Sequence, residues 1–152
     1  LAHMGKNIVA CGGPGTGQVA KICNNLVLAI SMVGVCEASN LGAKLGIDSK
    51  VLAGIFNTST ARCWSSDSYN PVPGVGPATV PSSNAYEGGF GSQLMLKDLG
   101  LAAEAARDVG APIPLGAEAH AVYQILVANG LGKKDFSVVY KFLGGDVSNS
   151  KA

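Results

Sequence analysis

Charged side chains are scarce in this chain of 152 residues. Asp, Glu, Lys and Arg make up 14% of the sequence, whereas a typical soluble domain contains about 25%. Eleven basic and ten acidic residues leave a formal net charge of +1, and they are spread along the chain. A nucleic-acid-binding domain needs a concentrated basic surface, so we expect no nucleic-acid partner. So little charge also indicates that a partner subunit or a further domain covers part of the surface.

Metal-ligand patterns and long apolar runs are missing as well. The cysteines form no CxxC motif, and neither histidine lies at zinc-ligand spacing from one. We expect no metal site and interpret four residues as buried thiols: Cys11, Cys23, Cys36 and Cys63. The longest apolar run, Leu26 to Cys36, has 11 residues, and a helix that crosses a bilayer needs about 20. We therefore predict no membrane span.

The start of the chain shows no targeting signal. It has neither the basic region and cleavage site of a secretory leader nor the Arg-rich pattern of a presequence. The first four residues, LAHM, are either native or a cloning remnant.

Apolar residues recur at helical spacing through most of the chain, which predicts an all-α fold. The longest helix is expected over residues 16–45. About four more are expected: from a cap at Asp48 or Ser49 to about Asn57, over Ser92–Val109, over residues 114–130, and a last short helix capped by Asp135. The only convincing strand is the short run from Lys6 to Gly13.

The segment from Ser65 to Gly91 breaks this helical pattern. It holds four of the seven prolines and is rich in Gly, Ser and Asn, which predicts a long irregular loop. Loops of this length inside a compact domain are usually functional or disordered. Four aromatic residues in or beside the segment favour order: Trp64, Tyr69, Tyr86 and Phe90.

A proline-glycine loop precedes the long helix, in the sequence CGGPGTGQVAKICNN. Such a loop commonly holds a phosphate at a helix N-terminus. An ATP-binding loop needs a Lys followed by Ser or Thr at its end, and this chain has Gln18 and Val19 there. The ATP interpretation is therefore excluded.

A dinucleotide fingerprint is the second interpretation of the same loop. Its glycine positions are formally matched by Gly15, Gly17 and Ala20. In such a site the first helix is followed by a second strand, whereas residues 16–45 form one predicted helix here. The match is therefore weak.

The third interpretation concerns Lys21 and Asn25, which lie on one face of the long helix because residues four apart are neighbours. Apolar residues surround both. A lysine that is desolvated on such a face has a depressed pKa, which makes Lys21 a candidate general acid or base near neutral pH. The alternative is that Lys21 extends into solvent and that Asn25 is an ordinary surface amide.

Two segments resemble the signatures of the β-hydroxyacid dehydrogenase family. GTGQVAKICNN is similar to its Gly-x-Gly-x-x-x-Lys-x-x-x-Asn motif, and GGFGSQLMLKDLGLA to its motif around Lys-Asp-Leu. The resemblance implies the C-terminal, helical domain of an enzyme with the 6-phosphogluconate-dehydrogenase-like fold. Residues 1–13 would be the last strand and linker of an absent Rossmann domain, residues 14–147 a substrate and dimerisation domain, and residues 148–152 a tail.

The same resemblance implies roles for individual residues. Lys21 is the implied catalytic lysine. Substrate-binding roles are implied for Asn25, Gly15, Gly17, Trp64 and Tyr69. Cofactor-binding roles are implied for Lys97, Phe90 and Asp98. The alternatives are a solvated charge pair for Lys97 and Asp98, and ordinary core or loop packing for the aromatic residues.

The implied reaction is the NAD-dependent oxidation of a small 3-hydroxy acid, in which Lys21 takes the hydroxyl proton as hydride leaves. RCWSSDSYNPVPGV, at residues 62–75, is similar to a loop of family members that oxidise 3-hydroxyisobutyrate to methylmalonate semialdehyde in valine breakdown. Tartronate semialdehyde, succinic semialdehyde and glyoxylate are the alternative substrates, and NADP is the alternative cofactor.

The resemblance further implies that NAD is bound mainly by the absent N-terminal domain, so we expect this chain alone to be inactive. It implies a homodimer or homotetramer formed through the helical domain. Its location would be the mitochondrial matrix in a eukaryote and the cytoplasm in a bacterium. A non-enzymatic helical dimerisation module is the alternative from another functional class.

Overall fold

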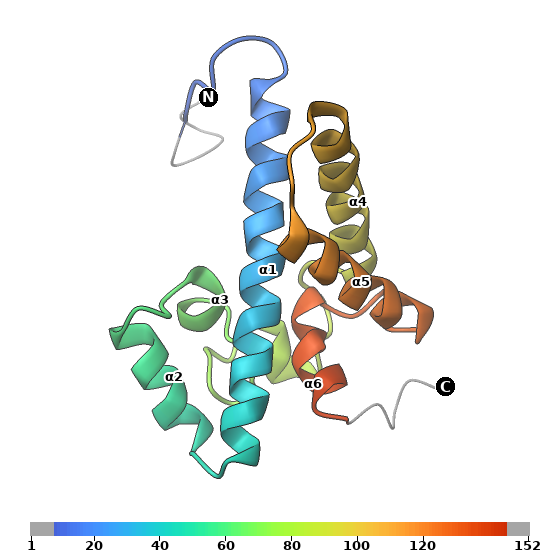
Figure 1. Ribbon diagram of the computed structural model, residues 1–152. Helices are drawn as coiled ribbons and strands as arrows, with labels where there is room; N and C mark the ends of the chain where they lie inside the picture. Colours follow the sequence, from blue (N-terminus) through green and yellow to red (C-terminus); the bar gives the residue numbers. More distant parts are fainter. Residues whose placement is uncertain (1–7, 146–152) are drawn as a thin grey trace.

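The computed structural model describes residues 8–145 as helices packed around one long helix (Figure 1). The elements are α1 Thr16–Lys44, α2 Ser49–Thr58, α3 Trp64–Asp67, the 3-10 helix η1 Pro81–Asn84, α4 Ser92–Val109, α5 Pro114–Ala128, the 3-10 helix η2 Phe136–Val138 and α6 Val139–Leu143. In Figure 1, α2 and α3 lie on one side of α1, and α4 and α5 lie on the other. The all-α prediction is confirmed for this part of the chain.

The predicted strand at Lys6–Gly13 is not observed where the chain is described. Residues 8–13 have no strand geometry, and residues 6 and 7 lie outside the described residues. A strand needs a neighbouring strand for its hydrogen bonds, and residues 8–145 offer none. The predicted tail at 148–152 also lies outside the described residues.

Glycines set both ends of α1. Gly15 is the N-cap residue and has a φ of 86°, in the left-handed region that favours glycine. After the last turn, Gly46 has a φ of 89° and the N–H of Ile47 donates to the carbonyl of Gly42 at 3.1 Å. This is the Schellman arrangement that ends many helices. The observed helix has 29 residues, in agreement with the predicted range.

Side-chain caps also lie where the sequence predicts them. The Asp48 side chain accepts hydrogen bonds from the N–H groups of Lys50 and Val51, and α2 begins after it. Asp135 caps the last helical segment by accepting from the N–H of Ser137 at 3.0 Å. Each cap satisfies N–H groups that a helix N-terminus leaves without a partner.

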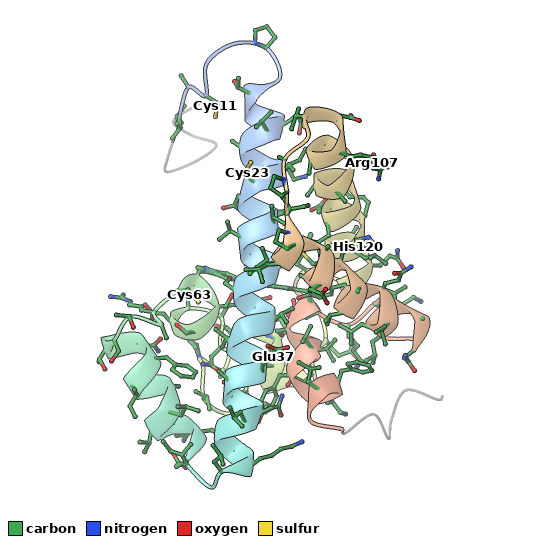
Figure 2. The ribbon with its side chains drawn as sticks, in the orientation of Figure 1. Cys11, Cys23, Glu37, Cys63, Arg107 and His120 are labelled. Carbon is green, nitrogen blue, oxygen red and sulfur yellow. The ribbon has the colours of Figure 1, made fainter. Side chains whose placement is uncertain are left out.

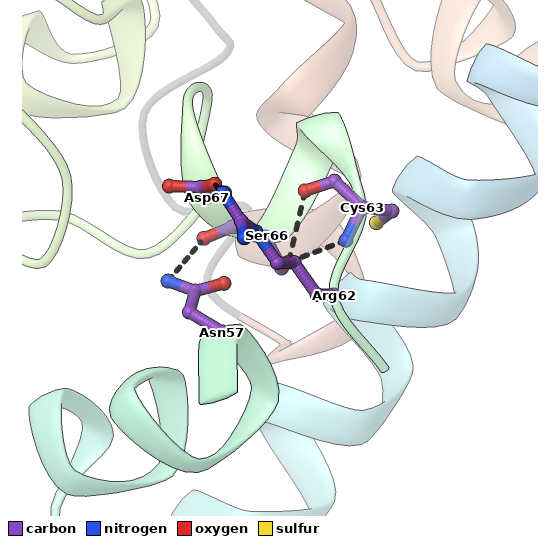
Figure 3. A network of polar contacts seen from close by, with 5 residues as sticks. All are labelled: Asn57, Arg62, Cys63, Ser66 and Asp67. Carbon is purple, nitrogen blue, oxygen red and sulfur yellow. Dashed lines mark hydrogen bonds and ion pairs between the residues drawn. The ribbon is translucent and has the colours of Figure 1, made fainter. Parts of the chain in front are cut away.

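The prediction of one irregular loop over Ser65–Gly91 is wrong in part, because α3 and η1 lie within or beside this range. Figure 3 shows the contacts that hold α3. Ser66 Oγ accepts from the N–H of Cys63 and donates to its carbonyl, and Asn57 donates to the carbonyl of Ser66. Arg62 pairs with Asp67 at 2.7 Å. A single turn shows no apolar periodicity, so the sequence pattern missed it.

The core contains side chains from α1, α4, α5 and the last helical segments. Its largest fully buried members include Met32, Met95, Tyr123, Leu126 and Phe136. Helix α1 contacts each of the other five α-helices, so its direction and rotation determine where every other element packs.

The prediction of four buried thiols is correct only for Cys36. Cys11 and Cys23 are exposed, and Cys63 is intermediate (Figure 2). A cysteine is buried only where a second element covers it, and the described residues leave the faces that carry Cys11 and Cys23 uncovered. Burial raises the pKa of the Cys36 thiol well above its usual value.

Helix α1 meets the length and composition criteria for a membrane-crossing helix. The sequence prediction of no such segment was therefore too strict, because it considered only an uninterrupted apolar run. One helix of this kind is weak evidence, since a central helix of a soluble protein passes the same test. Several apolar side chains on α1 are exposed, among them Val19, Val27 and Leu41.

Candidate active site

Four polar side chains of α1 and α4 contact one another in sequence: Asn24, Asn25, Asp98 and Lys97. We call this set the polar chain. Asn24 Nδ2 donates to Asn25 Oδ1 at 3.1 Å, and Asn25 Nδ2 donates to Asp98 Oδ2 at 2.6 Å. The other carboxylate oxygen, Asp98 Oδ1, lies 2.8 Å from Lys97 Nζ. The two sequence motifs, one on each helix, therefore meet at the Asn25–Asp98 hydrogen bond.

A small hollow of about 60 Å³ lies between the same two helices. We call it the Lys21 hollow; Gln18, Lys21, Ile22, Asn25, Asp98 and Leu101 line it. Lys21 and Asn25 face it together because they are one helical turn apart. The hollow thus brings together an amine, an amide and a carboxylate.

Asp98 is buried, with 6% of its surface exposed. Burial raises the pKa of its carboxyl, but the hydrogen bonds from Lys97 and Asn25 and the positive charges of Lys97 and Lys21 outweigh it, so the pKa lies below its usual value. Asp98 is therefore an anion at neutral pH. The alternative prediction of a solvated Lys97–Asp98 pair is therefore wrong for Asp98, which is buried. It is correct for Lys97, whose side chain is 55% exposed.

Of the two interpretations of Lys21, the structure agrees with the one in which its side chain extends into solvent. Lys21 is exposed, and its positive charge acts on the nearby Asp98 carboxylate. Its neighbours Val19, Ala20 and Cys23 are exposed too, so no second element covers this side of α1 in the described residues. Residues 8–145 therefore leave the amine open to solvent.

Trp64 and Tyr69 form an aromatic wall on the side of α1 that carries α3. Their rings are stacked, with centroids 4.5 Å apart and planes at 18°. Trp64 lines a second hollow, of about 380 Å³, with Asn24, Val27 and Leu28. We call this the Trp64 hollow. The predicted substrate-pocket residues Trp64 and Tyr69 thus lie together. Trp64 shares its hollow with Asn24, the residue that precedes Asn25 in the sequence.

Three other predicted site residues line neither hollow. Phe90 packs edge-on against Phe136, with centroids 6.0 Å apart. Gly15 and Gly17 lie at the N-terminal end of α1, where an added Cβ would meet nothing within 4 Å in the described chain. Only Gly15 has a backbone conformation that requires glycine.

Two polar residues of this region were missed as site residues. Asn24 directly precedes the predicted site residue Asn25 and donates a hydrogen bond to it. The adjacent pair of amides in the sequence is a signal that could have revealed this local contact. Asp135 was predicted only as a helix cap, yet it also contacts Tyr69. No sequence signal reveals that contact, because it joins residues 66 positions apart. Within residues 8–145, no three His, Cys, Asp or Glu side chains gather as a metal site.

A protein-family model matches residues 15–143 of this chain. The family is described as NAD-binding of NADP-dependent 3-hydroxyisobutyrate dehydrogenase. NAD is the cofactor that this family match supports.

Similar proteins include the probable mitochondrial 3-hydroxyisobutyrate dehydrogenase of Dictyostelium discoideum, which is 64% identical over 99% of this chain and 46% of that protein. The mitochondrial 3-hydroxyisobutyrate dehydrogenase of Bos taurus is 60% identical over 94% of this chain and 42% of that protein. The chain therefore spans less than half the length of these relatives.

Among solved structures, the 3-hydroxyisobutyrate dehydrogenase of Mycobacterium tuberculosis with L-serine has a TM-score of 0.87 and 40% identity, over 92% of this chain and 47% of that one. The 3-hydroxyisobutyrate dehydrogenase of Salmonella typhimurium has a TM-score of 0.72 and 26% identity, over 85% of this chain and 42% of that one.

Proposed function

Since the chain belongs to the 3-hydroxyisobutyrate dehydrogenase family, we propose that it is the C-terminal, lysine-bearing domain of an NAD-dependent enzyme. That enzyme oxidises 3-hydroxyisobutyrate to methylmalonate semialdehyde. The observation that carries the proposal is the grouping of Lys21, Asn25 and Asp98 around one hollow between α1 and α4.

Each side chain in this group has a chemical task. Oxidation of the alcohol removes its hydroxyl proton, and the Lys21 amine is the proposed acceptor of that proton. One N–H of the Asn25 amide is bonded to Asp98, which leaves the second N–H to bind the alcohol oxygen. The Asp98 carboxylate fixes the orientation of that amide and attracts the cationic form of Lys21.

NAD, when bound, accepts the hydride of the alcohol carbon. The described residues offer a suitable donor for its phosphates in Lys97, whose side chain is 55% exposed. Phe90 offers a half-buried ring. Most of the binding surface for NAD would lie in a Rossmann domain that precedes the segment described here.

We propose that the Trp64 hollow receives the methyl branch of 3-hydroxyisobutyrate. Trp64, Val27 and Leu28 present apolar surface there, which suits a methyl branch better than the second polar group of tartronate semialdehyde. Succinic semialdehyde and glyoxylate differ from the carbon skeleton of 3-hydroxyisobutyrate in length. They are therefore the competing substrates to compare.

The test is a steady-state assay of the full-length protein that contains this chain. We expect NAD-dependent oxidation of 3-hydroxyisobutyrate with a larger kcat/KM than for the hydroxy acids of the three competing substrates. We expect no turnover by the 152-residue chain alone. A full-length protein that leaves 3-hydroxyisobutyrate unchanged, or turnover by the short chain, would contradict the proposal.

Self-association is the second candidate role, and one observation favours it. Apolar side chains at the end of α1 and on α2 are exposed, among them Leu41, Leu45, Val51 and Ile55. We propose that a second copy covers this surface in a homodimer or homotetramer. Sedimentation of the chain should therefore give a dimer or tetramer, and Leu45→Glu should shift it towards monomer. Lys44→Glu, at an exposed neighbouring position, is the matched control.

The location follows the names of the relatives, several of which are called mitochondrial. We propose the mitochondrial matrix if the source is a eukaryote and the cytoplasm if it is a bacterium. Fractionation of source cells followed by immunoblotting with an antibody to this chain tests the assignment.

A further inference from the structure

Asp135 is a fully buried carboxylate with four hydrogen-bond donors around it. Its Oδ2 atom accepts from the Tyr69 hydroxyl at 2.9 Å and from the N–H of Phe90 at 2.8 Å. Its Oδ1 atom accepts from the N–H of Ser137 at 3.0 Å and from its hydroxyl at 2.5 Å. A helix cap needs only the bond to the N–H of Ser137, so the Oδ2 contacts lie beyond the capping role.

The chain at residues 85–90 curves around this carboxylate. Ala85 and Tyr86 have φ values of 49° and 60°, and Gly89 has 64°. Non-glycine residues rarely adopt this conformation unless their surroundings hold them there. One such contact is the hydrogen bond from the N–H of Asp135 to the carbonyl of Tyr86 at 2.9 Å.

Gly89 shows how closely the backbone approaches. A Cβ at this position would lie 2.2 Å from Asp135 Oδ2 and 2.6 Å from the Tyr69 hydroxyl. Only glycine fits between these two groups, so the Tyr69–Asp135 contact and the course of the loop depend on each other.

The same hydroxyl links Asp135 to the candidate active site. The Tyr69 ring stacks on Trp64, and Trp64 lines the Trp64 hollow beside Asn24. Asn24 in turn donates to Asn25. A fixed Tyr69 therefore fixes the Trp64 ring that stacks on it, and with it one side of the Trp64 hollow.

Tyr69 remains a donor at neutral pH. Burial raises the pKa of its phenol, and the negative charge of Asp135 and the hydrogen bond to it raise the pKa further. The proton that makes the contact with Asp135 is thus retained at neutral pH.

We propose that Asp135 is a positioning residue of the substrate pocket. It holds the Tyr69 hydroxyl and the Phe90 backbone, and through Tyr69 it sets the place of Trp64 in the aromatic wall. The contact between the aromatic wall and substrate is part of the proposed function, so this inference rests on it. The ordering of the aromatic wall by Asp135 rests on the hydrogen bonds and ring contacts described above.

The first experiment measures the wall without substrate. Trp64 is the only tryptophan of the chain, so fluorescence of the 152-residue protein reports its surroundings. Tyr69→Phe removes only the hydroxyl. We expect acrylamide quenching of Trp64 to rise about twofold, because the ring it stacks on loses one hydrogen bond. Tyr140→Phe, at a half-buried tyrosine on α6, should leave quenching unchanged.

Asp135→Asn tests the carboxylate itself and should raise quenching at least as much as Tyr69→Phe. Circular dichroism establishes that each variant is folded; if Asp135→Asn does not fold, Tyr69→Phe alone decides. Quenching equal to that of the wild-type protein in folded Tyr69→Phe would overturn the proposal.

The second experiment uses the full-length enzyme and separates positioning from stability. Tyr69→Phe should raise KM for the hydroxy acid by about fivefold to tenfold, because the aromatic wall is held less firmly once the hydrogen bond to Asp135 is lost. It should leave KM for NAD unchanged. A purely structural role would lower kcat through a smaller active fraction and leave both KM values unchanged, and that result would overturn the proposal. If the wild-type enzyme does not oxidise 3-hydroxyisobutyrate, the proposed function fails, and the fluorescence result still decides the role of Asp135.

Discussion

Asn25 and Asp98 lie 73 positions apart in the sequence and are joined by a hydrogen bond of 2.6 Å between α1 and α4. One residue belongs to the motif that contains Lys21, and the other to the Lys-Asp-Leu motif. The bond therefore explains physically why the two motifs occur in one domain. An anion placed beside Asn25 orients its amide and also attracts the Lys21 amine.

Lys21→Ala should reduce turnover of the full-length enzyme by about 10²-fold to 10⁴-fold, the range typical for loss of a general acid or base. Folding should be unaffected because Lys21 is exposed. Lys44→Ala, at the other end of the same helix, is the matched control and should keep wild-type turnover. The measurements are steady-state kinetics and thermal unfolding of both variants. Near-normal turnover of Lys21→Ala would exclude the proton-transfer role.

Asn25 and Asp98 should be coupled energetically. A double-mutant cycle with Asn25→Ala and Asp98→Ala should give a coupling energy of about 1–2 kcal/mol in the free energy of unfolding, because the bond is charge-assisted and half-buried. The Arg62–Asp67 pair serves as a control; it is exposed, so its coupling should be within about 0–1 kcal/mol. Urea unfolding measures both cycles. Equal coupling energies in the two cycles would contradict the prediction that the Asn25–Asp98 hydrogen bond is stronger than the exposed Arg62–Asp67 pair.

Stability should fall in acid through Asp98. Its pKa in the folded state is below its usual value, whereas in the unfolded chain it is about 3.9. The stabilisation is therefore complete above about pH 5 and is lost as the pH falls through the folded pKa. Asp98→Asn should be less stable than wild type at pH 7, and the difference should shrink towards pH 3. Asp108→Asn, at an exposed carboxyl on α4, is the control; an Asp98→Asn difference that is constant with pH would refute the assignment.

Gly89→Ala should destabilise the domain more than Gly88→Ala, although the two residues are adjacent. Both have positive φ values, so each substitution costs roughly 1 kcal/mol from the left-handed conformation. Only at Gly89 would the added Cβ also collide with Asp135 and Tyr69; at Gly88 it meets nothing within 4 Å. We expect Gly89→Ala to cost at least about 2 kcal/mol more. Urea unfolding of the two variants measures this, and equal losses would contradict the close approach.

Several helix boundaries could be predicted because their signals are local. Asp48 caps α2 through N–H groups two and three residues later, and Gly110 ends α4 with a φ of 69°. Helix α3 could not be predicted, since its single turn depends on contacts from Asn57 and Asn70 to the carbonyl of Ser66. The exposure of Cys23 was also missed, because the residues beside it in the sequence do not tell which face of α1 other elements cover.

The sequence by itself determined the longer helices, several of their caps and the placing of Lys21 and Asn25 on one face of α1, because helical spacing and capping act over four residues or fewer. Only the tertiary structure decided that Asp98 meets Asn25 and that Asp135 meets Tyr69. Those contacts depend on how α4 and the segment after α5 pack against the rest of the domain. That packing is set by the shared core around Met32, Met95 and Phe136 and by no signal within either segment.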